Sequence, residues 1–590
     1  MEHAKFYCED VLYSDIILAE LTINKRLLAA DLGTFRSYAS MYSGPYMPPA
    51  KMEKTLREKI RGVSLIFACG TALFADGYAN GVIGSGTLVS QRWKDNIIDL
   101  LFQSTPVRNL KLPIRCFKLN QSPVLTRIYG ADALSHHMYS RTLSSLAFFG
   151  EIVGMLSFGY MSDKIGRKFG MMAATGIVIV FSALSAASKG AHGSVNGLLS
   201  MLSAMRFLVG IGIGAEYPCG SVAASEQSSE PAISSTSRHR WVALATSMNP
   251  AFPQSSRIIF TFHQDSMIDF GFVIASFVPL VLFWMSTFSF GNHHLNAVWR
   301  LSLALAIVPS TAVFLWRLNM DEPVRYKTDS MKYARIPYML VLRRYGVRLA
   351  AIAFIWFLYD FVAYPKDFQQ FGLYSSIIID RITGGSDDLV VVFGWNVIIN
   401  LFNMPGTIGG ALLLDRFGPK YVMITSLLLQ AAIGFIMSGA YERLTGHIAA
   451  FAVRPGNCTI LLAGKTSPTA VRGQFYGIAA AVGKLGAFVG TWAFPPIVDA
   501  FGGPSSTRGN TGPFWIGSGL AIISAIVTLL FIHPLDAEDI VKEDRSFREY
   551  LEAHGYDTSG MGLTEDRQVE TVDMGDNEKD EYDEVVRNPL

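Results

Sequence analysis

The sequence predicts an all-α polytopic membrane protein with about twelve transmembrane helices in two six-helix bundles. Hydrophobic residues make up 50% and charged residues only 17% of the 590 residues, which is too apolar for a soluble enzyme of this length. Apolar runs of about 20 residues, the length that crosses a bilayer, recur along the chain. Features of the first half also recur in the second, which indicates two related halves.

The expected organisation has five parts. They are a cytoplasmic N-terminal segment (1–62), a first bundle (63–316), a cytoplasmic central loop (317–347), a second bundle (348–533) and an acidic cytoplasmic tail (534–590). The spans are expected at 63–88, 144–161, 170–188, 197–218, 268–289, 298–316, 348–366, 390–414, 421–440, 446–464, 474–498 and 513–533.

Loop charge predicts the orientation of these spans. The loops after the second, sixth and eighth spans are rich in Lys and Arg, as in SDKIGRK and LDRFGPK. Because such loops stay in the cytoplasm, both termini are expected inside the cell. The tail is acidic and poor in aromatic residues, as in GDNEKDEYDE, so we expect it to be disordered.

One loop motif occurs twice. GYMSDKIGRK (159–168) follows the second span, and ALLLDRFGPK (411–420) follows the eighth with Asp, Gly and a basic residue in the same register. Spans 1 and 7 each hold an aspartate beside aromatic residues, Asp76 in LFADGY and Asp360 in WFLYDFVAY. Such repetition places a binding site near the membrane midplane, between the two halves.

These loops and RFLVGIGIGAEYP (206–218) on span 4 resemble the major facilitator superfamily. GIGIGAEYPCGSVAASE and GIAAAVGKLGA resemble, more narrowly, the phosphate:proton symporter family and its fungal glycerophosphodiester (glycerophosphoinositol) permeases. The resemblance covers nearly the whole chain from about residue 63 to 534 and implies the major facilitator fold. It also implies a conformational gating motif made of Gly159, Asp163, Gly166 and Arg167, with Asp415 in the second copy.

Lys484 is the one charged residue in AAAVGKLGAFVGTW (479–492). A charge at a helix centre costs about 2.5 to 3.5 kcal/mol on insertion scales, so it indicates either an ion pair within the bundle or a functional site. An ammonium group suits a phosphate oxygen. The resemblance implies that Lys484 contacts the phosphoryl group. Gly483, Gly486 and Ala487 would let another helix or the ligand approach closely.

Further substrate contacts are expected on three spans. Trp356, Asp360 and Tyr364 are spaced at i, i+4 and i+8, so they lie on one helix face. The resemblance implies that this face lines the substrate site. It also implies that Tyr217 donates its hydroxyl to the anion and that Asn457, in PGNCT, contacts phosphate.

Three carboxylates are candidate proton carriers. Asp360 lies in lipid, where a carboxylate needs a partner or a proton. Burial would raise the pKa of Glu216, on span 4, toward working pH, so that it could load a proton. Asp76 is the third candidate, and the other interpretation is an ion pair with Arg206 or another buried base. Glu151, on span 2, could line the cavity wall.

Asp269, in SMIDFGF, stands where phosphate symporters carry a glutamine. A carboxylate disfavours a bare dianion nearby but accepts hydrogen bonds from hydroxyl groups. This favours a phosphodiester with polyol arms as the substrate. The alternative is that Asp269 is an interfacial residue at the start of its helix.

The sequence therefore predicts a secondary transporter that imports a glycerophosphodiester, with glycerophosphoinositol the expected substrate, together with protons across the plasma membrane. An inorganic phosphate:proton symporter and a nutrient-sensing receptor on a transporter scaffold are the alternatives. The expected partners are a small anionic substrate, protons and the bilayer, and the expected state is a monomer. A net charge of +2 implies no nucleic-acid partner, and five scattered cysteines indicate no metal site. The sequence shows no nucleophile, metal cluster or nucleotide loop, so we also expect no cofactor and no enzymatic activity.

Three segments depart from the family pattern. Residues 91–124 and 247–265 look like insertions, and the tenth span looks shortened near Arg454. We hypothesise retained introns at the first two and a mistaken splice at the third. Sequencing the transcript tests this, because a message that encodes all three segments would exclude it.

Overall fold

The protein is described from a computed structural model. It describes residues 74–75, 77–82, 125, 128, 139–228, 265–290, 295–365, 389–401, 404–444, 459–503, 506–534 and 539–562. All of them belong to one compact unit, residues 59–590. The expected N-terminal segment (1–62), nearly all of the two apparent insertions and the shortened region near Arg454 lie outside these ranges.

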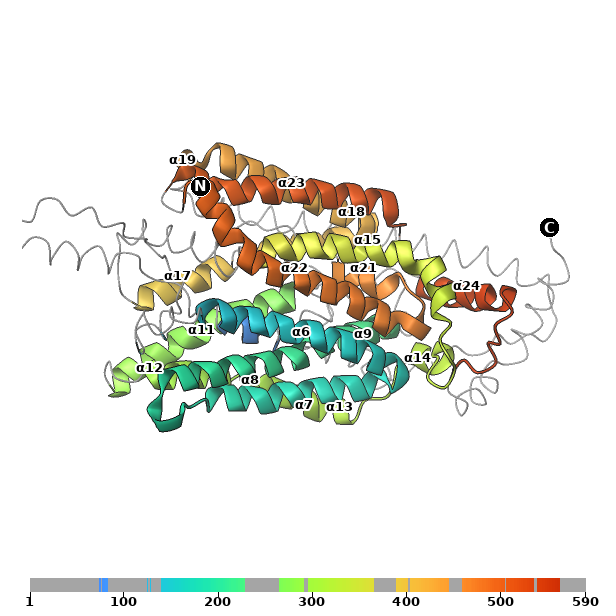
Figure 1. The fold of residues 1–590 in the computed structure, drawn as a ribbon, viewed down its shortest axis with the longest axis horizontal. Coiled ribbons are helices and arrows are strands. Elements are labelled where there is room, and N and C mark those ends of the chain that lie inside the picture. Colours follow the sequence, from blue (N-terminus) through green and yellow to red (C-terminus); the bar gives the residue numbers. More distant parts are fainter. Residues whose placement is uncertain are drawn as a thin grey trace, which may run out of the picture. The chain divides into compact units, whose positions relative to one another are not determined.

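Within these ranges the regular structure is helical (Figure 1). The first half contains α6 (Tyr139–Lys164), α7 (Arg167–Ala186), α8 (Val195–Glu216), a π-helical turn (Tyr217–Ser221), α9 (Val222–Ser228), α11 (Asp265–Phe290), α12 (Leu295–Ala304) and α13 (Ile307–Leu318). The second half contains α14 (Val324–Asp329), α15 (Tyr338–Pro365), α17 (Leu389–Leu401), α18 (Met404–Gly439), α19 (Tyr441–Leu444), α21 (Thr459–Lys465), η6 (Thr469–Val471), α22 (Arg472–Ala500), α23 (Thr507–Phe531) and α24 (Asp539–Ala553).

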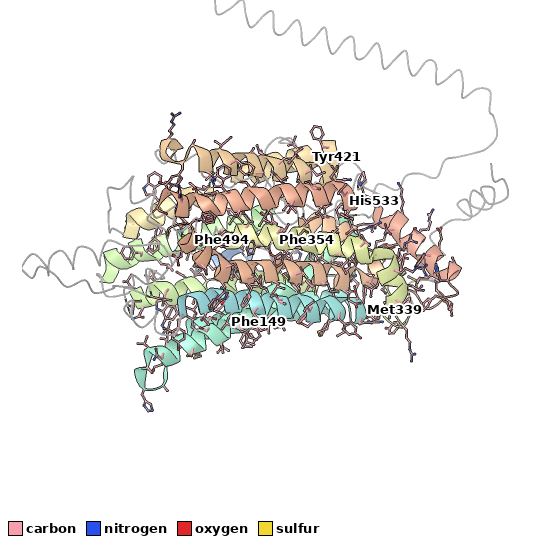
Figure 2. The ribbon with its side chains drawn as sticks, turned by 45° about the horizontal axis from the view of Figure 1, so that its top comes forward. Phe149, Met339, Phe354, Tyr421, Phe494 and His533 are labelled. Atoms are coloured by element: carbon pink, nitrogen blue, oxygen red, sulfur yellow. The ribbon has the colours of Figure 1, made fainter. Side chains whose placement is uncertain are left out.

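Nine spans among the described residues are long and apolar enough to cross a membrane. Large apolar side chains cover their outer faces. Phe149 on α6, Phe354 on α15 and Tyr421 on α18 are exposed examples (Figure 2). An outer surface of this kind is what lipid solvates, since the helices satisfy their own backbone hydrogen bonds.

Glycines allow the helices of the first half to pack closely. A Cβ atom on Gly210 of α8 would lie 2.2 Å from the Ala147 carbonyl oxygen of α6, and one on Gly214 would lie 2.1 Å from that of Glu151. Only glycine permits this approach of two backbones. The glycine repeat of span 4 therefore fixes α8 against α6.

Among the described helices, the two halves make their most extensive contacts along two interfaces. At one, α6 packs against α22, which also packs against α15. A Cβ atom on Gly477 of α22 would lie 2.4 Å from the Met155 carbonyl oxygen of α6. At the other, α11 packs against α17.

Both copies of the loop motif contain a glycine with positive φ. Gly166, between α6 and α7, has φ 148°, and Gly418, inside α18, has φ 76°. L-residues with a side chain rarely adopt these values, so glycine is needed to end one span and begin the next. The break at Gly418 divides α18 into the expected eighth and ninth spans.

Three elements differ from the sequence-based boundaries. Span 4 was expected to end at Pro218, which lacks the N–H for a helical hydrogen bond. A π-helical turn accommodates this proline, and the helix continues to Ser228. α15 begins at Tyr338, inside the expected central loop. The prediction of a disordered tail is wrong for residues 539–553, which form α24 and bury Ile540, Phe547 and Leu551.

Candidate functional site

Lys484 forms an ion pair that joins the two halves of the chain. Its Nζ lies 3.0 Å from Oε2 of Glu151, and both side chains are at most 1% exposed. Lys484 belongs to α22 and Glu151 to α6. Removing either partner would leave a buried charge uncompensated, which costs several kcal/mol. The ion pair expected within one bundle is thus an ion pair between the two halves.

Glu151 also connects Lys484 to other polar groups of the first half. Asn80 Nδ2 donates to Glu151 Oε1 at 3.1 Å. Arg206 of α8 donates to Asn80 Oδ1 at 3.3 Å and to the Ala79 carbonyl at 2.9 Å. A hydrogen-bonded chain therefore runs from α22 through α6 to the first span and α8. Asp76, the expected partner of Arg206, lies outside the described residues.

Aromatic rings surround the lysine. The ammonium lies 5.4 Å from the ring centroid of Tyr217 and 5.7 Å from that of Phe148. Trp356 lies 6.4 Å from Tyr217 and 5.7 Å, edge-on, from Tyr476, measured between ring centroids. Both distances to the ammonium fall within cation–π range, so the rings stabilise a cation here without neutralising it.

Glycines beside Lys484 bring α15 close. A Cβ atom on Gly483 would lie 2.5 Å from Cδ1 of Trp356, and one on Gly486 would lie 2.3 Å from the Phe357 carbonyl oxygen. The expected close approach of a second helix is confirmed at these two positions. The approach puts Trp356 of α15 beside the lysine helix.

Of the other expected substrate contacts, the structure describes the side chains of some and not of others. Asp360 is buried on α15, one turn beyond Trp356, and Asp269 is buried on α11 with 7% of its surface exposed. Tyr364 belongs to α15, but its side chain is outside the described part. Asn457 lies outside the described residues altogether.

Glu216 lies in an ion pair within the first half. Arg317 of α13 donates to both of its carboxylate oxygens, with Nη1 3.0 Å from Oε2. Arg317 also donates to Thr175 Oγ1 at 2.7 Å and to the Met171 carbonyl at 3.0 Å, both on α7. This arrangement ties α8, α7 and α13 together.

The first copy of the loop motif binds the first turn of α22. Asp163 accepts hydrogen bonds from the backbone N–H groups of Gly473 at 2.9 Å and Gln474 at 2.8 Å, and from Arg167 at 2.5 Å. N–H groups in the first turn of a helix have no partner within the helix, so a carboxylate there satisfies them and also meets the positive end of the helix dipole. Gly159 permits the contact, because a Cβ atom there would lie 2.8 Å from the Gly473 carbonyl oxygen.

A buried charge cluster extends this contact. Glu226 of α9 pairs with Arg167 at 2.9 Å and with Arg472 of α22 at 3.2 Å. Asp415, of the second motif copy, lies in α18, but its side chain is outside the described part. Gly159, Asp163 and Arg167 of the first copy thus join the two halves where α6 ends and α22 begins, while Gly166 forms the turn between α6 and α7.

α24 adds a layer beside this cluster. Asp544 accepts hydrogen bonds from the Thr469 backbone N–H at 2.6 Å and hydroxyl at 2.8 Å, and lies 3.5 Å from Arg472. Burial raises the pKa of Asp544 to about 6, against the opposing effect of Arg472. Its neighbour Glu543 accepts a hydrogen bond from Arg348 of α15 at 3.2 Å.

Two parts of this arrangement were missed from the sequence. Glu151 was assigned only to a cavity wall, although a single carboxylate in the apolar run AFFGEIVGML was a signal that a basic partner must exist. Arg317, a basic residue at the end of span 6, likewise indicated that a carboxylate partner must exist, and that partner is Glu216. The pairing of cations with carboxylates depends on how the helices pack. The spacing of residues along the chain does not determine that packing.

Comparison with known proteins identifies relatives over nearly the whole chain. The model of the sugar (and other) transporter family matches residues 63–335 and 340–542. The glycerophosphocholine permease GIT4 of Candida albicans is 36% identical over 549 residues, covering 90% of this chain and 90% of its own. The major glycerophosphoinositol permease GIT3 of the same species is 35% identical over 512 residues, covering 84% and 83%.

A solved structure shares the fold. The major facilitator superfamily proton:xylose symporter XylE, bound to 6-bromo-6-deoxy-D-glucose, matches with a TM-score of 0.58 and 16% sequence identity, covering 83% of this chain and 99% of the symporter chain. At that identity the likeness concerns the fold alone. It confirms the predicted fold class.

Proposed function

Because the chain belongs to the sugar (and other) transporter family of the major facilitator superfamily, we propose that it imports a glycerophosphodiester together with protons by alternating access. Glycerophosphoinositol is the proposed substrate, and the plasma membrane the proposed location, with both termini in the cytoplasm and the monomer as the working unit. The glycerophosphodiester permeases among its relatives support this substrate class.

The ion pair between Lys484 and Glu151 is the observation that carries the proposal. Lys484 is buried and already neutralised by a carboxylate 3.0 Å away. An anion that binds the ammonium must therefore compete with Glu151, because two carboxylate-like charges beside one lysine would leave an uncompensated buried charge. A proton on Glu151 removes the competitor.

Charge balance then couples the substrate to a proton. Before binding, the pair carries one positive and one negative charge. After binding, Lys484 faces the diester monoanion and Glu151 is protonated, so the site is neutral again. On the inner side Glu151 loses the proton, returns to Lys484 and displaces the anion. The cycle moves one proton for each diester charge, and a phosphate dianion would leave one negative charge uncompensated.

The remaining carboxylates have secondary roles in this proposal. Asp76 and Asp360 are proposed proton carriers on the path to Glu151. Glu216 would have to leave Arg317 before it could accept a proton, and for that reason we rank it below the other two. Asp269 would accept hydrogen bonds from substrate hydroxyls.

The aromatic and amide groups would hold the phosphodiester itself. We propose that Tyr217 turns its hydroxyl toward the phosphoryl oxygens and that Trp356 packs against the bound molecule, since both rings lie beside Lys484. Tyr364 and Asn457 are assigned by the family resemblance. The contact of Asp163 with α22 would keep the inner side closed until substrate and proton are bound, with Asp415 acting in the second half.

Uptake of radiolabelled glycerophosphoinositol tests the proposal, in cells that lack their own permeases. We expect uptake that rises at acidic external pH, that excess phosphate does not suppress, and that Lys484→Ala abolishes. Lys189→Ala is the matched control, because Lys189 is an exposed lysine that follows α7, outside the site and both copies of the loop motif. Glu151→Gln should keep binding but lose the acid stimulation. Uptake of phosphate in place of the diester would establish the alternative symporter.

A further inference from the structure

A second polar cluster lies at the α11–α17 interface, which also joins the two halves. Asn396 Nδ2 donates to Ser276 Oγ at 3.2 Å, and Asn400 Nδ2 donates to the same oxygen at 2.8 Å. Asn400 Nδ2 also lies 2.9 Å from the Asn396 carbonyl oxygen and 3.3 Å from Asn396 Oδ1. The two asparagines are four residues apart, so they share one face of α17, in the apolar run LVVVFGWNVIINL.

This cluster is at about the same depth as the Lys484–Glu151 pair. α11 runs parallel to the first span, because Gly77 packs on Ile268 and Gly81 packs on Ala275. Asn80, which hydrogen-bonds to Glu151, therefore lies beside the part of α11 that carries Ser276. With a rise of about 1.5 Å per residue, the two groups differ in depth by about one helical turn.

The two interfaces thus flank the site at one level. The α6–α22 interface supplies a cation and the α11–α17 interface supplies amides and a hydroxyl. Asp269, which precedes Ser276 by seven residues and two turns, lies on the same face of α11. The Asp269 carboxylate therefore lies on this face near the N-terminus of α11, which begins at Asp265.

The chemistry of the cluster suits a polyol. Each amide offers two N–H donors and an acceptor oxygen, and a polyol hydroxyl both donates and accepts. A hydroxyl can therefore replace each neutral hydrogen bond of the cluster without leaving a buried group unsatisfied. A trimethylammonium group offers no donor and gains nothing from an amide nitrogen.

We propose that Asn396, Asn400 and Ser276 bind the inositol arm of the substrate, rather than its glycerol arm, while Lys484 binds its phosphoryl group. This inference rests on the proposed function and names the part of the site that sets head-group specificity. In the unloaded protein both asparagines donate to the Ser276 hydroxyl, which itself donates to the Phe272 carbonyl of α11 at 2.9 Å. In the loaded protein hydroxyls of the polyol take over these hydrogen bonds.

Binding of two diesters to the purified protein tests the proposal. The ligands are radiolabelled glycerophosphoinositol and glycerophosphocholine, each measured against wild type, Asn400→Leu and Asn396→Leu. We expect the leucine variants to bind glycerophosphoinositol five- to tenfold more weakly, the loss of about one hydrogen bond, and to bind glycerophosphocholine with less than twofold change. Asn319→Leu, at an exposed asparagine that follows α13, is the matched control and should change neither affinity.

The outcomes separate this inference from the proposed function. Equal weakening of both diesters by the cluster variants, or no weakening of either, would overturn the inference and leave the transporter proposal standing. If wild type binds neither diester, both are overturned. Because leucine could disturb the packing of α11 and α17, Ser276→Ala is tested beside them. It removes one hydroxyl and should weaken glycerophosphoinositol alone.

Discussion

Asp163 holds the proposed cytoplasmic ends of the two halves together, and Asp163→Asn should release them. The carboxylate accepts hydrogen bonds from two backbone N–H groups of α22, from the Gln474 side-chain amide and from Arg167. Asparagine keeps one acceptor oxygen but turns an NH₂ group toward a backbone N–H. One hydrogen bond is lost and the others lose the negative charge that strengthens them.

The size of the effect follows from these contacts. A hydrogen bond to a charged group contributes about 1.5 to 3 kcal/mol, so the change should weaken inner closure by about 3 kcal/mol. That corresponds to about a hundredfold shift between closed and open states. We expect the variant to spend more time open to the cytoplasm and to transport more slowly, because the outward-facing state becomes rarer.

Alkylation of a cysteine at position 225 measures this shift. Ser225 on α9 is 1% exposed and donates to the Gly464 carbonyl of α21 at 3.0 Å, across the two halves. With the five native cysteines replaced, Ser225→Cys should react slowly with N-ethylmaleimide and up to about a hundredfold faster once Asp163→Asn is added. Asp499→Asn, at the exposed far end of α22, should leave the rate unchanged. An unchanged rate in the folded Asp163 variant would refute the reasoning.

Three further predictions concern pH, packing and a buried ion pair. The pKa of Asp544 is raised to about 6 when α24 is docked, so docking should be strongest below about pH 4 and should weaken as pH rises through 6. Hydrogen exchange of the α24 amides measures this pH dependence. Asp544→Asn should remove it. Gly483→Ala should destabilise the protein by about 1 to 3 kcal/mol in thermal unfolding, because the new Cβ meets the indole of α15, whereas Gly519→Ala, with nothing within 4 Å, should not. Arg317→Met should cost about 3 to 5 kcal/mol by leaving Glu216 buried alone, and adding Glu216→Gln should restore much of it; no recovery would contradict the ion-pair account.

Much of the fold could be predicted from the sequence. Apolar runs placed most spans within a few residues, because lipid demands helices of fixed length. The resemblance to the fungal glycerophosphodiester permeases is confirmed by relatives of 35 and 36% identity. The burial of Lys484 was also predictable, since a charge in such a run has to be enclosed.

The partners of the charged groups could not be predicted. Lys484 meets Glu151 because α6 packs against α22 in one register, and that register depends on Gly159 and Gly477 contacting backbone far along the chain. α24 was missed for a different reason. Averaging composition over the acidic tail hid the apolar positions of Ile540, Phe547 and Leu551, whose spacing of seven and four is helical.

Proton movement in proteoliposomes tests the central claim most directly. The protein would be reconstituted with a pH indicator outside, and glycerophosphoinositol added without any imposed gradient. We predict external alkalinisation of one proton per diester taken up, lost in Glu151→Gln although that variant still binds the diester, and lost with binding in Lys484→Ala. Diester uptake with no proton movement, or unchanged proton movement in Glu151→Gln, would contradict the exchange of Glu151 for substrate at Lys484.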